Sequence, residues 1–91
     1  MEQIRGGLRR IMSDVLKNQP DEEAAMLAWP VVCGREVASR TRAVSFSDGR
    51  LTIEVPDTNW RAQLAEFTPR YLSSFHELMG AVVKEVKFRV K

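Results

Sequence analysis

Two short β-rich runs, joined by a tight turn, limit the folds open to this chain more than any other feature of its sequence. They cover residues 41–47 and 50–55, and a Ser-Asp-Gly turn separates them. In the second run Leu51, Ile53 and Val55 alternate with polar residues. A period of two is typical of a strand that is buried on one face and wet on the other. The pattern therefore predicts an antiparallel β-hairpin with one face against a core.

The residues before the hairpin show the spacing of amphipathic helices. Apolar positions predict a first helix over residues 4–16, which ends before Pro20 because proline disfavours helical backbone in the residue preceding it. A second helix is expected to begin with Asp21 as its cap. Pro30 predicts a break or kink at Trp29, with the helix resuming to about residue 39. Gly34 is expected to let another element approach closely.

The residues after the hairpin predict more helix and a last strand. Asp57 and Thr58 are typical helix-start residues, and Thr68-Pro69 repeats the start signal. The apolar positions continue at helical spacing from Trp60 until Gly80, so this stretch is either one kinked helix or two helices meeting at Thr68. Residues 82–90 alternate like a third strand. We expect a single α+β domain over residues 1–91, with the order helix, helix, strand, strand, long or split helix, strand, and with helices on one face of a three-stranded sheet.

Several classes of function lack the residues that they need. Cys33 is the only cysteine and His76 the only histidine, so neither an internal disulfide nor an ordinary metal site is expected. No apolar run reaches the roughly 18–20 residues that cross a bilayer, and no secretory signal or phosphate-binding loop is visible. No nucleophile, base or carboxylate pair is arranged for catalysis. We expect a cytoplasmic, non-enzymatic protein without metal, cofactor, small-molecule substrate or membrane contact.

The basic residues gather in two places, although the net charge is only +2. One group is expected on the wet face of the sheet and the other on the first helix. Either group could bind nucleic acid or an acidic protein surface, or could simply be solvated. Trp29 and Trp60 are expected in the core rather than at an interface. The candidate binding residues are Arg42, Arg50, Lys87 and Arg89 on the sheet, and Arg5, Arg9 and Arg10 on the helix.

From Trp29 onward the chain resembles the DciA family. The resemblance rests on the order and spacing of four stretches, which together span most of the chain. The four stretches are Trp-Pro-Val-Val-Cys-Gly-Arg-Glu-Val-Ala at 29–38, Asp-Gly-Arg-Leu-Thr-Ile-Glu-Val at 48–55, Asn-Trp-Arg-Ala-Gln-Leu at 59–64 and Val-Lys-Phe-Arg-Val at 86–90. The sequence has no Gly-x-x-Gly loop, the element with which nucleic-acid-binding KH domains usually clamp the backbone of their ligand.

The resemblance implies a fold and a partner. It implies a KH-like core domain that is associated with loading and operating the bacterial replicative DNA helicase. On this reading the protein is a non-catalytic adaptor, with single-stranded or forked DNA as a second ligand. The alternative is a stand-alone KH-like module that binds RNA or DNA through the basic sheet face.

Overall fold

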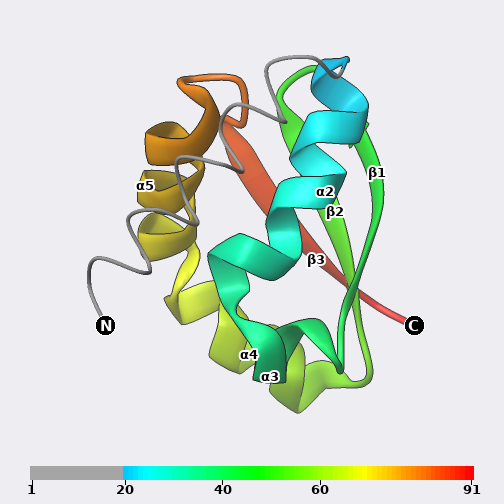
Figure 1. The fold of residues 1–91 in the computed structure, drawn as a ribbon. Coiled ribbons are helices and arrows are strands. Elements are labelled where there is room, and N and C mark those ends of the chain that lie inside the picture. The colour runs from blue at the N-terminus through cyan, green and yellow to red at the C-terminus, as the bar shows by residue number, and fades with distance from the viewer. Residues whose placement is uncertain (1–19) are drawn as a thin grey trace.

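The computed structural model describes residues 20–91 of the chain. The helix predicted over residues 4–16 lies outside this range. Helices and a three-stranded mixed sheet make up the described part, which confirms the α+β class (Figure 1). In chain order the elements are α2 (Asp21–Cys33), α3 (Arg35–Ala38), β1 (Arg42–Ser47), β2 (Arg50–Val55), α4 (Thr58–Glu66), α5 (Thr68–Met79) and β3 (Glu85–Val90).

The sheet has the order β1-β2-β3, with β1 antiparallel and β3 parallel to β2. The predicted hairpin is confirmed, and Asp48 and Gly49 form its two-residue turn with φ of 53° and 81°. Positive φ at both central positions is what type I′ turns require, and their twist matches that of the strands. A bulge interrupts the pairing of β1 with β2 between Ala43 and Ser45.

The second helix begins at Asp21, so the prediction that Asp21 caps it is wrong. Pro20 occupies the cap position, and its carbonyl already accepts the first helical hydrogen bond from the Ala24 amide at 2.8 Å. Asp21, Glu22 and Glu23 instead fill the first turn, where their negative charge is favourable beside the positive end of the helix dipole.

Helix α2 breaks at Gly34 and not at Trp29. Pro30 lies inside the helix, because its fixed φ is compatible with helical backbone and its ring is exposed to solvent. Gly34 has φ +88°, a conformation that residues with a Cβ atom rarely adopt, and this ends the helix. The expectation of a close approach at Gly34 is also wrong, since an added Cβ atom would meet nothing within 4 Å.

The segment after the hairpin forms two helices. The Asp57 side chain caps α4, as expected, by accepting a hydrogen bond of 2.9 Å from the Trp60 amide. Phe67, with φ −93° and ψ 1°, separates α4 from α5. Pro69 then falls in the first turn of α5, where its missing N–H costs no hydrogen bond.

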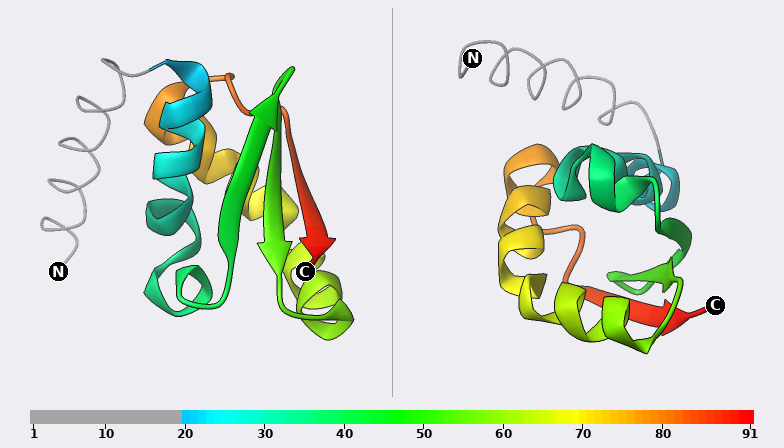
Figure 2. Two further views of the ribbon diagram at one scale, coloured as in Figure 1. Left: turned by 90° about the vertical axis from the view of Figure 1, so that its right-hand side faces the viewer. Right: turned by 90° about the horizontal axis from the view of Figure 1, so that it is seen from below.

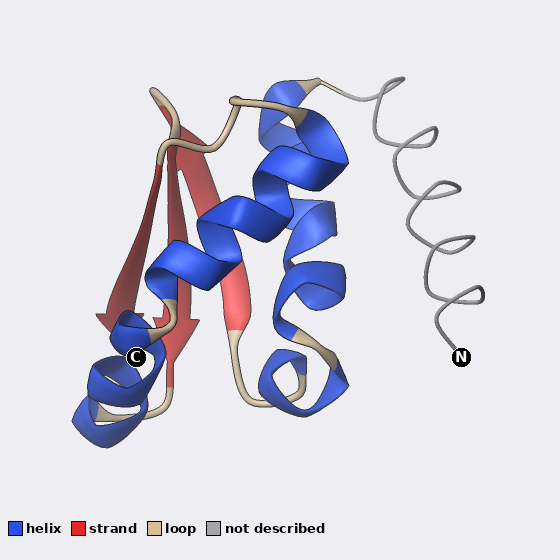
Figure 3. Ribbon diagram, turned by 90° about the vertical axis from the view of Figure 1, so that its left-hand side faces the viewer, coloured by secondary structure: helices blue, strands red, loops and turns tan. Residues whose placement is uncertain are grey.

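The core lies between the sheet and the helices α2 and α5 (Figure 3). Leu51, Ile53 and Val55 of β2 point into it, as the alternation predicted. At its centre the Trp29 ring, 1% exposed, lies 5.1 Å from the ring of Tyr71 and 6.4 Å from that of Phe75, measured between centroids. Burying a large apolar side chain contributes about 1.5–3 kcal/mol, so these contacts fix the helices on one face of the sheet.

The Trp29 ring is also held by its polar edge. Its indole Nε1 donates a hydrogen bond of 3.0 Å to Thr41 Oγ1. The Thr41 hydroxyl in turn donates to the Val37 carbonyl at 2.8 Å. This chain of bonds ties α2 to α3 and to the start of β1, which positions the edge of the sheet. Trp60 is only half-buried and packs against the margin of the core.

Candidate functional site

The face of the sheet that points away from α2 and α5 is the main polar surface built by the strands. We call it the open face. Strand register places its side chains in three rows across β1, β2 and β3. All of them are exposed except Thr52 and Glu54, which are half-buried. The rows are Arg42-Glu54-Arg89, Ser45-Thr52-Lys87 and Ser47-Arg50-Glu85.

Two of the four cations on this face are paired with carboxylates. Arg50 Nε lies 3.1 Å from Glu85 Oε2, and Arg89 Nη2 lies 3.3 Å from Glu54 Oε2. Both pairs join β2 to the parallel neighbour β3. Exposed pairs of this kind contribute only about 0–1 kcal/mol each, so a charged ligand can compete for their members.

Of the predicted sheet residues, the structure brings all four to the open face but gives them different surroundings. Arg50 and Arg89 have carboxylate partners, whereas Arg42 and Lys87 have none among residues 20–91. Four cations stand against two carboxylates, which leaves the open face a net charge of +2. Its positive potential is therefore concentrated around Lys87 and Arg42. The other three candidates, Arg5, Arg9 and Arg10, lie outside the described residues.

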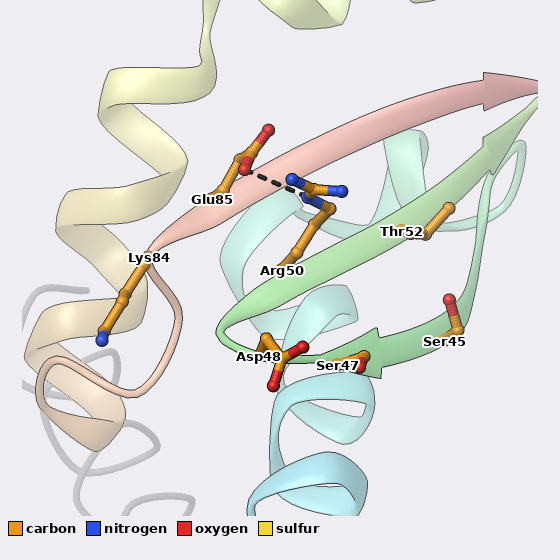
Figure 4. Close-up of a pocket in the computed structure, with 7 residues that line it drawn as sticks. All are labelled: Ser45, Ser47, Asp48, Arg50, Thr52, Lys84 and Glu85. Atoms are coloured by element: carbon orange, nitrogen blue, oxygen red, sulfur yellow. Dashed lines mark hydrogen bonds and ion pairs between the residues drawn. The ribbon is translucent and has the colours of Figure 1, made fainter.

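A shallow hollow of about 520 Å³ lies on the open face beside the hairpin turn (Figure 4). The ion pair of Arg50 and Glu85 lies in it, and Lys84 points away from that pair. Sequence reasoning missed the contribution of the hydroxyl groups. The alternation that predicted the buried face of β2 could have found it, because residues two apart share a face. The hydroxyl-bearing residues of the hollow are Ser45, Ser47 and Thr52.

The hollow is lined by polar groups of both charges. Asp48 and Glu85 place carboxylates beside the cations, so it is not a simple anion cradle. Lys84 continues its wall, and its backbone amide donates to the Gly49 carbonyl at 2.8 Å, which holds the start of β3 against the turn. Hydroxyls, carboxylates and a guanidinium together suit a polar macromolecular surface with mixed charge.

Among the described residues, the side chains that could ligate a metal ion or act as a nucleophile lie apart or are poorly reactive. No group of three His, Cys, Asp or Glu side chains within residues 20–91 is arranged to hold a metal ion. Burial raises the pKa of the Cys33 thiol to about 12, so the thiol stays protonated near neutral pH and is a poor nucleophile. His76 is exposed on α5. No helix in the described part of the chain has the length and apolar character needed to cross a membrane.

Comparison with known proteins agrees with the resemblance seen in the sequence. The model of the family described as "Dna[CI] antecedent, DciA" matches residues 4–88. The UPF0232 protein BL0636 of Bifidobacterium longum is 32% identical over 60 residues, which is 65% of this chain. The chain spans 38% of the length of that relative. Because the family model matches nearly the whole sequence, including β1, β2 and most of β3, this chain belongs to the DciA family.

Proposed function

We propose that this domain is a non-catalytic adaptor that docks on the bacterial replicative DNA helicase and biases its engagement with DNA. The observation that carries the proposal is the family match over residues 4–88. A KH-like fold is part of the same proposal. Any ATP hydrolysis then belongs to the helicase, since no nucleotide-binding motif is present in this sequence.

The open face is the surface that we assign to docking. Its charge is concentrated at Arg42 and Lys87, and its ion pairs are exposed enough to exchange partners. Docking on an acidic surface would give Arg42 and Lys87 carboxylate partners that are shielded from water, and such charge complementarity sets specificity and association rate. Its hydroxyl groups add hydrogen-bond donors and acceptors between the charges.

Light scattering after size-exclusion chromatography tests the proposal. The protein is mixed with the replicative helicase of its own host, without DNA, at moderate salt. We expect a complex of defined stoichiometry, and we expect Lys87→Glu to weaken it at least about tenfold, since a buried charge pair lost at an interface costs about 2–5 kcal/mol. Arg61→Glu makes the same charge change at an exposed position of α4 and serves as the matched control.

Two results would contradict this assignment in different ways. Separate elution of the two proteins at tens of micromolar would refute the adaptor role itself. A complex that Lys87→Glu and Arg61→Glu weaken equally would leave the adaptor role standing and remove the open face as its contact surface.

A second candidate function is a stand-alone module that binds single-stranded RNA or DNA through the open face. The observation that favours it is that Arg42 and Lys87 lie on one face without a carboxylate partner among the described residues. The strand residues of this face include no aromatic side chain, so bases would find no stacking platform and binding would follow the phosphates. Titration of a labelled oligonucleotide across salt tests this, and Lys87→Glu should lower the salt slope by about 1.

A further inference from the structure

A second surface lies at the edge of the sheet and shares Arg42 with the open face. A groove of about 350 Å³ runs between α2 and the beginning of β1. Its walls are mainly apolar and come from Leu27 and Pro30 of α2 and from Ala43 of β1. Leu27 is 50% exposed, although other apolar residues of the same helix pack into the core. Single exposed leucines are ordinary, but this one forms a wall of a hollow.

The groove is bordered by an edge of the sheet. Within residues 20–91, β1 pairs with β2 and with no other strand, so alternate backbone N–H and C=O groups of β1 point outward. Figure 2 (left) shows β1 facing the viewer, with no described element in front of it. The bulge between Ala43 and Ser45 divides this edge, and its first part lies beside the groove. A bulge usually limits pairing to a short segment, which disfavours indiscriminate association.

The lining of the groove selects the chemistry of an occupant. Arg42 is the one charged side chain among the residues that line it, and no carboxylate lines it. The Trp29 indole N–H is already bonded to Thr41, so the floor offers apolar surface and no free donor from that ring. A nucleic acid brings a phosphate with every nucleotide and needs several cations or an exposed aromatic ring, and this groove supplies one cation.

We propose that this groove and the adjoining edge of β1 receive an extended, acidic–apolar segment of a partner protein, which adds a short strand beside β1. Main-chain hydrogen bonds to the edge would hold the segment, an apolar side chain would lie against Leu27 and Ala43, and a carboxylate would pair with Arg42. The inference rests on the proposed function, in that the segment belongs to the helicase. It adds a second contact that is distinct from Lys87 and from the hollow at the turn.

Hydrogen–deuterium exchange on the complete complex tests this contact. The host helicase is the probe, and exchange is followed by mass spectrometry in the peptide that covers residues 40–47, with and without the helicase. We expect exchange of the β1 amides to slow at least tenfold in the complex. We also expect Leu27→Glu to weaken the complex at least tenfold. The new carboxylate would repel the carboxylate of the partner segment and would replace the apolar surface against which the partner's apolar side chain lies.

The controls separate this inference from the proposed function. Ala65→Glu adds the same charge at an exposed position of α4 and should leave the affinity unchanged. Leu27 is half exposed, so Leu27→Glu should keep the fold, which the unfolding midpoint verifies. If the complex forms normally with Leu27→Glu and hydrogen exchange of the β1 amides is the same with and without the helicase, the groove is not a contact surface. The adaptor role would remain intact.

The remaining outcomes also decide the matter. Absence of any complex would overturn the groove and the adaptor role together. Protection of residues 40–47 by single-stranded DNA alone would show that the edge receives a nucleic acid and would overturn the proposed occupant. A dimer of the chain alone, with the same amides protected, would assign the groove to a second copy of the chain. That result would also overturn the proposed occupant.

Discussion

The hydrogen bond between the Trp29 indole and Thr41 allows the packing of the core to be tested with a change of one small group. In Thr41→Val the side chain keeps its shape but loses the hydroxyl. The Trp29 N–H, in a residue 1% exposed, then has no acceptor, whereas the Val37 carbonyl keeps a hydrogen bond from the Arg40 amide. A buried polar group left without its partner costs about 1–3 kcal/mol, so we expect the free energy of unfolding to fall by about 2 kcal/mol.

Urea unfolding followed by far-ultraviolet circular dichroism measures this loss. With a slope of about 1–1.5 kcal/mol per molar urea for a small domain, the midpoint should fall by about 1.5 M. Thr52→Val is the matched control, because it removes a hydroxyl from the open face, in a strand position where valine is favourable. We expect this control to change stability by less than about 0.5 kcal/mol.

A double-mutant cycle shows whether the loss belongs to the bond itself. Trp29→Phe removes the indole N–H, and in its presence Thr41→Val should cost markedly less, since no buried donor is left without an acceptor. The reasoning would be refuted if Thr41→Val destabilised the protein no more than Thr52→Val does, or if its cost were the same with Trp29 and with phenylalanine at that position.

Three further outcomes are expected. Gly34→Ala, at φ +88°, should lower the free energy of unfolding by about 1–3 kcal/mol in a thermal or urea melt, whereas the neighbouring exposed change Arg35→Ala should be nearly silent. Asp57→Ala removes the cap on the Trp60 amide and should cost about 0.5–2 kcal/mol in the same melt, and Asp57→Ser should recover most of it. Because partial burial raises the pKa of Cys33 from 9.0 to about 12, alkylation of the folded protein at pH 8 should be much slower than in urea, and equal rates would contradict the raised pKa.

The sequence was most informative where a pattern repeats within a few residues. The alternation of Leu51, Ile53 and Val55 predicted the buried face of β2, and Asp57 predicted the start of α4. Both depend on near neighbours in the chain. The break of α2 was misplaced because proline is the stronger breaker in isolation. In the folded protein the packing of Trp29 holds the helix across Pro30, and Gly34 ends it.

The candidate site was predicted as a set of residues but not as an electrostatic arrangement. Arg42, Arg50, Lys87 and Arg89 reach one face, as the alternation required. Which of them are neutralised depends on how β3 aligns with β2, a pairing of residues 35 apart in sequence. The ion pair of Arg50 and Glu85 could not be assigned before that register was known. The edge groove depends equally on α2 and β1 meeting in space.

The parallel pairing of β2 with β3 also shapes how the chain folds as it is made. The hairpin of β1 and β2 closes over a two-residue turn and can form in about 1–10 μs. Synthesis at about 5–20 residues per second takes a further 2–7 s or so to deliver β3, which pairs with β2 from 35 residues away. During that interval β2 is itself an open edge, with Leu51 and Ile53 unburied by β3. A chain that stops before Glu85 would keep this edge permanently, and would be prone to pair with other chains.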